Sequence, residues 1–241
     1  MIVNVEIEGK NYTANLNQGI DISIAVGKEN QVKAYGIPDA EITVYVDGSF
    51  VGDVSQGGSC NVRDIKFNPH GNGTHTECIG HVSKNYIEIN SLETPGHFTA
   101  NLISINTSDC ITKDHLQVLG NKPTTEGLII RTLPNSNSKL KKDHTGASAA
   151  YIHPNAMKFI NELGISHLIV DLPSVDHETD PALQSHKVYW DLKSGEKSNK
   201  TITELVYISN SVQDGLYLVN LMMPNMHCDA VPSKPILYPL R

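Results

Sequence analysis

The alternation of apolar and polar residues predicts β-strands through most of the first half of the chain. MIVNVEIEGKNYTANL alternates on both sides of EGKN, which is typical of a hairpin, and further strands are expected in NYIEI, HFTANLISI and GLIIRTL. The clearest hairpin is EITVYV-DG-SFVGDV, where Asp47 and Gly48 suit the positive φ angles of a type I′ turn. TKDHLQVLG predicts a short helix. The N-terminal half is therefore expected to be rich in β-structure.

The second half combines helical periodicity with buried strands. HPNAMKFINELG places Pro154 in a first helical turn, apolar residues on one face, and Gly164 at the end. A strand at 128–133, a helix at 154–163 and a strand at 167–172 predict a right-handed parallel crossover. A second helix is expected in DPALQSHKVYWDL, and later strands in ITELVYI and GLYLVNLMM.

The pattern shows no internal repeat and no long linker. PNSNSKLKKDHTGASA has almost nothing to bury, so we expect a mobile insert whose basic cluster at 139–144 is a solvated loop. The fold class is therefore expected to be α/β, as a single domain over residues 1–241 with a mixed sheet.

The composition narrows the classes of partner. A formal net charge of −7 leaves no basic excess, so general binding to nucleic acid or to an anionic membrane is not expected. No segment approaches the ~20 apolar residues of a membrane helix. Four cysteines without a C-x-x-C pair and an N-terminus unlike a signal peptide predict a reduced, cytoplasmic protein.

The stretch NPHGNGTHTECIGHV (68–82) contains most of the candidate chemistry. His75 and Glu77 are two residues apart, so in an extended strand their side chains leave the same face. Imidazole and carboxylate together suit zinc, manganese or ferrous iron. A glycine-rich turn that carries surface histidines has the same composition, so the spacing leaves both interpretations open.

A metal site needs further ligands, and two candidates lie downstream. His186 stands in LQSHKVYW, although a single helical histidine is more often a surface or core residue. Glu204 lies within the apolar run ITELVYI, where burying its charge is costly unless it is paired or binds an ion. Trp190 follows His186 by four residues and shares its helix face, either lining a substrate pocket or packing in the core.

The stretch also resembles the Putative cyclase family, which contains the bacterial kynurenine formamidases and isatin hydrolases. The family fingerprint H-x-G-T-H-x-D-x-P-x-H falls on GNGTHTECIGH (71–81), with matches at Gly73, Thr74, His75 and His81. Other family-like segments occur in the family's order, namely GIDISI (19–24), GLIIRT (127–132), ELGISHLIVDLPSVD (162–176) and the tail that begins at VQDGLYLV. The resemblance spans about residues 19–241.

The resemblance implies a swivelling β/β/α fold, a divalent metal (Zn or Mn, one or two ions) and a homo-oligomer, usually a dimer or tetramer. It implies that His75, Glu77, His186 and Glu204 hold the metal and that His81 is the general acid/base. The implied reaction is hydrolysis of a small amide, formamide, cyclic amide or lactone by a metal-activated water, with His81 as proton shuttle.

Three departures from the fingerprint qualify this expectation. Gly71 stands where the first histidine belongs, Glu77 replaces the aspartate, and Ile79 stands where the family has a proline. His70 reaches the metal if the loop is reshaped, or Cys78 supplies a thiolate, although a buried structural cysteine is commoner. A catalytically inactive member that binds a metal or a small ligand is the alternative function.

Overall fold

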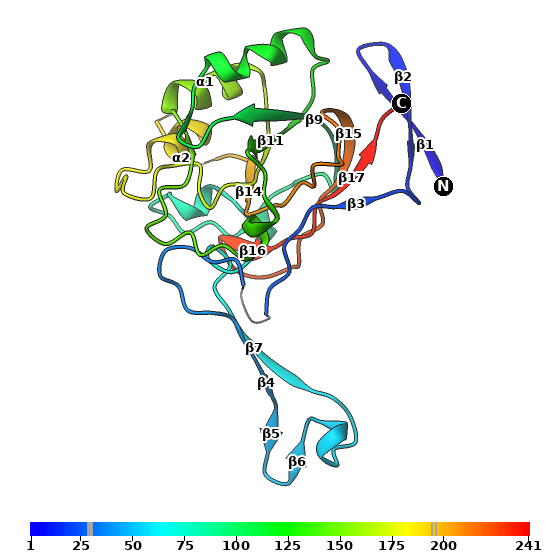
Figure 1. Cartoon of the computed structure of the whole chain (residues 1–241), viewed down its shortest axis with the longest axis vertical. Helices are drawn as coiled ribbons and strands as arrows, with labels where there is room; N and C mark the ends of the chain where they lie inside the picture. The colour runs from blue at the N-terminus through cyan, green and yellow to red at the C-terminus, as the bar shows by residue number, and fades with distance from the viewer. Residues whose placement is uncertain (28–30, 194, 196) are drawn as a thin grey trace.

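A curled nine-stranded mixed sheet organises the computed structural model, which describes residues 1–27, 31–193, 195 and 197–241 (Figure 1). From edge to edge its strands are β16 (Ala230–Pro232), β8 (His75–Glu77), β14 (Thr201–Glu204), β13 (His167–Val170), β11 (Gly127–Leu133), β9 (His97–Asn106), β15 (Gly215–Asn220), β17 (Ile236–Pro239) and β3 (Ile20–Asp21). The α-helices are α1 (Pro154–Glu162) and α2 (Gln184–Tyr189). The predicted α/β class with a mixed sheet is confirmed.

The predicted crossover forms the centre of the sheet. β11 and β13 pair in parallel, and α1 connects them. Because successive residues of a strand face opposite sides, Leu128 and Ile130 of β11 pack in one core cluster, which also contains Ile160 of α1. Ile129 packs in a second cluster with Val219 of β15. The central strands are thus buried on both faces, as parallel strands usually are.

Six strands outside the central sheet form a hairpin and a projecting ribbon, and two more form a short separate pair. β1 (Ile2–Ile7) and β2 (Lys10–Asn15) form the predicted N-terminal hairpin. A two-stranded ribbon over residues 41–66 projects from the body (Figure 1). It consists of β4 (Glu41–Val44) paired with β7 (Arg63–Lys66), and β5 (Val46–Asp47) paired with β6 (Phe50–Val51). β10 (Cys110–Ile111) and β12 (Tyr151–Ile152) pair in parallel.

The ribbon's turn differs from the expected type I′ turn by one residue. Asp47 pairs with Phe50, so the corner residues are Gly48 and Ser49 rather than Asp47 and Gly48. Of these residues only Gly48 has a positive φ, of 56°. β4 pairs with β7 instead of continuing the hairpin, so the second predicted strand of the hairpin is reduced to β6.

Several shorter predictions are corrected in detail. NYIEI is not a strand. Ile89 is buried against Cys78 and Val231, and Ile87 packs beside them, without pairing in a sheet. The short helix predicted in TKDHLQVLG is a 3₁₀ helix over Asp114–Asn121. ITELVYI pairs only as far as Glu204, because Leu205 has a φ of 53° and leaves the strand. The remaining 3₁₀ helices are Val54–Gln56, Ile79–His81, Ile89–Ser91 and Asn137–Lys141.

The segment 134–149 is not the solvated insert that its composition predicts. It contains the 3₁₀ helix Asn137–Lys141, and Lys139 Nζ lies 2.7 Å from Oδ2 of the buried Asp171. Asn135 and His144 are also buried. Part of the polar composition thus serves a buried ion pair, which a count of apolar residues does not detect. Within the described ranges, no helix has the length and apolar character needed to cross a membrane.

His167 makes stability depend on pH without involving the candidate site. Its ring stacks on Phe98 at 4.2 Å, its Nδ1 lies 2.9 Å from Thr201 Oγ1, and burial lowers its pKa to about 4. The unfolded chain therefore binds this proton below about pH 6.5, while the folded chain binds it only near pH 4. Through this group the parent protein loses about 1.4 kcal/mol of stability for each pH unit of acidification between these values. We expect His167→Gln to abolish this loss.

Urea unfolding of both proteins at several pH values from 5 to 8 checks this expectation. Above pH 7, where the imidazole is neutral in both states, the two profiles should run parallel, and below it the parent protein should lose stability more steeply. Parallel profiles across the whole range would contradict the prediction.

Candidate metal centre

The sheet brings together residues that are far apart in the chain. His75 and Glu77 lie two residues apart on β8 and are both buried. The antiparallel register places Glu204 of β14 directly opposite His75, so their side chains share a face of the sheet. α2 adds His186, which is also buried. The same-face prediction for His75 and Glu77 therefore extends across the neighbouring strand to Glu204.

His75, Glu77, His186 and Glu204 form a cluster in which four buried atoms face one another without hydrogen bonds. His186 Nε2 lies 3.0 Å from Glu77 Oε1, and His75 Nε2 lies 3.4 Å from Glu204 Oε2. Yet His75 Nε2, both carboxylate oxygens of Glu77 and His186 Nε2 have no aligned hydrogen-bond partner among the described residues. Buried polar atoms rarely stay unpaired. A convergent set of imidazole nitrogens and carboxylate oxygens fits a divalent cation such as Zn²⁺ or Mn²⁺.

The second nitrogen of each imidazole is held by another group. His75 Nδ1 lies 3.3 Å from the carbonyl oxygen of Gly73, and His186 Nδ1 lies 2.6 Å from Asp176 Oδ2. Such partners fix the tautomer and the ring orientation of a ligating histidine. Glu204 is held in the same sense, because its Oε1 accepts the backbone N–H of Val175 at 3.0 Å.

The position of the missing fingerprint histidine has no room for a side chain. A Cβ at Gly71 would lie 2.4 Å from Cδ1 of Ile37 and 2.8 Å from its Cβ. His70 enters the cluster instead, with its Nδ1 3.2 Å from Glu77 Oε2. Asn68 shapes this loop by accepting the backbone N–H of His70 on its Oδ1. The reshaped loop that His70 requires is thus present, while its role as a ligand stays a prediction.

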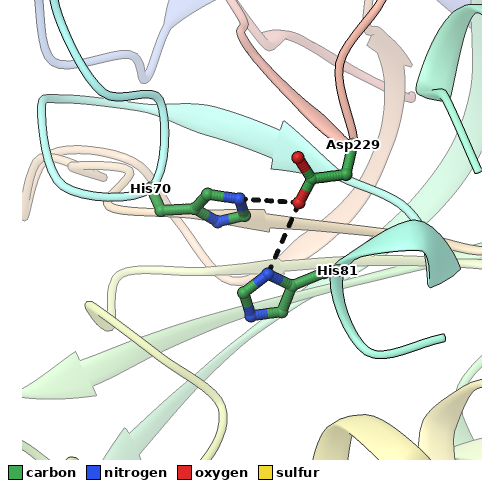
Figure 2. Close-up of side chains that lie close together, drawn as sticks. All are labelled: His70, His81 and Asp229. Carbon is green, nitrogen blue, oxygen red and sulfur yellow. Dashed lines mark hydrogen bonds and ion pairs between the residues drawn. The ribbon is translucent and has the colours of Figure 1, made fainter. Parts of the chain in front are cut away.

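His81 and a residue that sequence reasoning missed complete the group. His81 Nδ1 lies 3.5 Å from Asp229 Oδ2 and 3.8 Å from Glu77 Oε2. Figure 2 shows Asp229 between His70 and His81, with the second ring nitrogen of His81 pointing away from the carboxylate. Asp229 lies in the tail loop before β16, and nothing in its local sequence distinguishes it from other loop aspartates. Asp176, also missed, closes the family-like segment DLPSVD.

The charges of the cluster compensate one another strongly. Burial alone would raise the pKa of Glu77, but His81 and His186 hold it well below its usual range. Burial opposes protonation of His186, yet Glu77 and Asp176 raise its pKa to about 10. In the same way Asp229 and Glu77 overcome burial and raise the pKa of His70 to about 10. The carboxylates therefore carry negative charge and favour a cation among them.

Two candidate residues do not face the cluster. The thiol of Cys78 donates to the carbonyl oxygen of Ile87 and accepts from the N–H of Gly80, and burial raises its pKa to about 11. The thiolate alternative is therefore not supported. Trp190 is buried in the core, where it stacks on His186 at 5.6 Å and donates to Lys200 O. Trp190 therefore has the core position of the second alternative, and its substrate-binding role stays a prediction.

A cavity of about 310 Å³ opens beside the cluster. It is lined by Tyr35, Ile37, Asn68, His70, His81, Ser174, His177, Glu178, Leu183, His186 and Glu204. Its volume suits a small organic molecule. Trp190 is not among the residues that line it.

Comparisons with known sequences agree with this geometry. Residues 20–177, more than half of the chain, match the family described as Putative cyclase. The chain is also 28% identical over 187 residues to the kynurenine formamidase of Bacillus cytotoxicus, a match that covers 77% of this chain and 83% of that protein.

Comparisons with solved structures show the same fold. Isatin hydrolase A from Labrenzia aggregata superimposes with a TM-score of 0.67 at 14% identity, covering 92% of this chain and 93% of the other. A predicted metal-dependent hydrolase from Bacillus stearothermophilus gives a TM-score of 0.63 at 16% identity, covering 92% and 98%.

Proposed function

Because the chain belongs to the cyclase family, we propose that it is a metal-dependent hydrolase of a small amide, formamide, cyclic amide or lactone. The observation that carries the proposal is the set of buried, unpaired nitrogen and oxygen atoms on His75, Glu77 and His186. The names of similar proteins, a kynurenine formamidase and an isatin hydrolase, support cleavage of a non-peptide C–N bond.

The ion would be held by His75, Glu77, His186 and Glu204, with His70 beside them. When bound, Zn²⁺ or Mn²⁺ polarises a scissile carbonyl and lowers the pKa of water at the site. His81 lines the cavity and directs one ring nitrogen away from Asp229 (Figure 2). From there it delivers a proton to the leaving nitrogen or oxygen, as a general acid.

The cavity walls favour a compact substrate with an apolar part. Ile37 and Leu183 supply apolar surface, whereas Ser174 and the histidines and carboxylates of the cluster supply polar groups. A volume of about 310 Å³ accommodates a single substituted ring but not a peptide segment.

Chelation tests the proposal directly. The purified protein is treated with EDTA, reconstituted with Zn²⁺ or Mn²⁺, and assayed on an arylformamide, a cyclic amide and a lactone. We expect turnover of at least one compound, its loss on chelation and its return with the ion. Metal content by mass spectrometry should follow the activity.

Stoichiometric metal without turnover on any of these compounds would support the alternative, a catalytically inactive binding member. Turnover that survives complete removal of metal would contradict the role of the ion.

We further propose that the chain self-associates as a dimer or tetramer through the ribbon 41–66. Ile42 and Ile65 stand directly opposite each other on β4 and β7, and they are 45% and 62% exposed. A two-stranded ribbon without a covering layer is marginally stable in water. A second copy that covers this face would remove the apolar pair from water.

Replacing both Ile42 and Ile65 by aspartate is therefore expected to convert the assembly to monomers, because two charges would have to be buried at the contact. Light scattering after size-exclusion chromatography measures the mass. Thr43→Asp is the matched control, since Thr43 points to the other face of β4. An unchanged mass for the double variant would contradict this interface.

A further inference from the structure

His70 and His186 each face one carboxylate oxygen of Glu77, and both rings are held in the same way. His186 directs Nε2 at Glu77 while its Nδ1 contacts Asp176 at 2.6 Å. His70 directs Nδ1 at Glu77, 3.2 Å away, while its Nε2 forms a hydrogen bond of 2.9 Å with Asp229. In both cases one nitrogen is tied to a carboxylate and the other faces the shared carboxylate Glu77.

The two nitrogens of His70 differ in the quality of their contacts. The contact of Nε2 with Asp229 is an aligned hydrogen bond, so that nitrogen carries its proton towards the carboxylate. The contact of Nδ1 with Glu77 is close but not aligned, because Glu77 Oε2 remains without a hydrogen-bond partner among the described residues. In many metal sites a carboxylate holds one nitrogen of a histidine in this way, while the other nitrogen binds the metal.

From this geometry we propose that Asp229 is a positioning residue that makes His70 a metal ligand. When an ion displaces one proton of the ring, Asp229 keeps the remaining proton on Nε2, so that Nδ1 offers its lone pair to the ion. His70 thereby replaces the histidine that cannot fit at Gly71. The proposal rests on the metal-dependent function above and extends it to the way in which this chain restores an incomplete ligand set.

The fold holds Asp229 in this position independently of His70. Asp229 directly precedes β16, whose Ala230 pairs with Glu77 of β8. The backbone N–H of Cys78 donates to the carbonyl oxygen of Asp229 at 3.0 Å. Tyr86 contacts both the backbone N–H and the Oδ1 of Asp229, at 3.1 and 3.4 Å. The carboxylate is therefore anchored by the same strand pairing that places Glu77.

Asp229 also connects His70 to His81. The same oxygen, Oδ2, lies 2.9 Å from His70 Nε2 and 3.5 Å from His81 Nδ1 (Figure 2). One carboxylate thus orients both the substitute ligand and the proposed proton donor. A direct ligand role for Asp229, together with His70 and His81, is the competing arrangement that the experiment must separate.

A mutant cycle on Zn²⁺ affinity separates the two arrangements. Affinity is measured by competition with a chromophoric chelator for the wild type, Asp229→Asn, His70→Ala and the double variant. An amide nitrogen facing Nε2 favours the wrong tautomer, so Asp229→Asn alone is expected to weaken binding by about 10–100-fold. If Asp229 acts through His70, adding Asp229→Asn to His70→Ala should weaken Zn²⁺ binding by less than about twofold.

Equal losses in the two backgrounds would overturn the proposal, because Asp229 would then act on the ion without His70. An unchanged affinity of Asp229→Asn would overturn it as well. Absence of stoichiometric Zn²⁺ binding by the wild type would instead contradict the proposed function, and with it this inference.

Two further variants guard against a loss of structure. Glu88→Gln removes the carboxylate from an exposed pair with His227, 2.7 Å away, and should leave Zn²⁺ affinity unchanged. Circular dichroism of the metal-free proteins checks folding, and Asp229→Ser replaces Asp229→Asn in the cycle if the latter does not fold. The absorption spectrum of the Co²⁺ form adds an independent readout, since Asp229→Asn and His70→Ala should change it in the same way.

Discussion

Replacing Glu77 by glutamine is expected to weaken Zn²⁺ binding by about 100-fold or more. Loss of even an outer partner of a metal ligand commonly costs 10–100-fold in affinity, so loss of a direct ligand should cost at least as much. Glu77 is central because its Oε1 lies 3.0 Å from His186 and its Oε2 lies 3.2 Å from His70. Chelator competition with the metal-free protein measures the affinity.

The aspartate variant of Glu77 tests whether the longer side chain is needed. Glu77→Asp restores the family's residue but withdraws the carboxylate by about 1.5 Å. β8 is fixed between β14 and β16, so the backbone has little freedom to follow. We therefore expect an affinity between those of the wild type and Glu77→Gln, although aspartate is the residue that the family fingerprint contains.

Glu41→Gln, on the exposed ribbon, is the control for loss of a carboxylate. Wild-type Zn²⁺ affinity in Glu77→Asp would show that the longer side chain of glutamate is not required for binding. Wild-type affinity in Glu77→Gln would remove Glu77 from the ligand set.

Local patterns predicted the parts of the site that depend on neighbouring residues. The two-residue spacing of His75 and Glu77 fixed their common face, because side-chain direction in a strand has a period of two. The cost of burying a carboxylate singled out Glu204 within its apolar run. The crossover through β11, α1 and β13 followed from hydrophobic periodicity and the handedness rule.

The remaining parts depend on contacts between distant segments. Asp229 reaches His70 because β16 pairs with β8, and no local pattern encodes that pairing. The glycine at 71 was visible in the sequence, but its cause was not, since Ile37 belongs to another loop. The same limit explains the error at 134–149, where Lys139 finds its buried partner Asp171 on a distant segment.

Removing the imidazole of His81 is expected to lower kcat by about 10²–10⁴-fold while leaving the ion in place. General acid–base catalysis contributes rate enhancements of this size. His81 lines the cavity, its Nδ1 lies 3.5 Å from Asp229 Oδ2, and its other ring nitrogen points away from that carboxylate (Figure 2). His81→Ala should therefore impair proton delivery much more than metal binding.

The measurement combines kcat on a compound that the wild type hydrolyses with metal content by mass spectrometry. His177→Ala is the matched control, because His177 lines the same cavity and its Nδ1 contacts Thr179 rather than the cluster. A compound whose leaving group needs no proton should be hydrolysed by His81→Ala with a much smaller loss of kcat, since the acid is then dispensable. Loss of the ion from His81→Ala would instead make His81 a ligand, and an unchanged kcat on all substrates would exclude it as the proton donor.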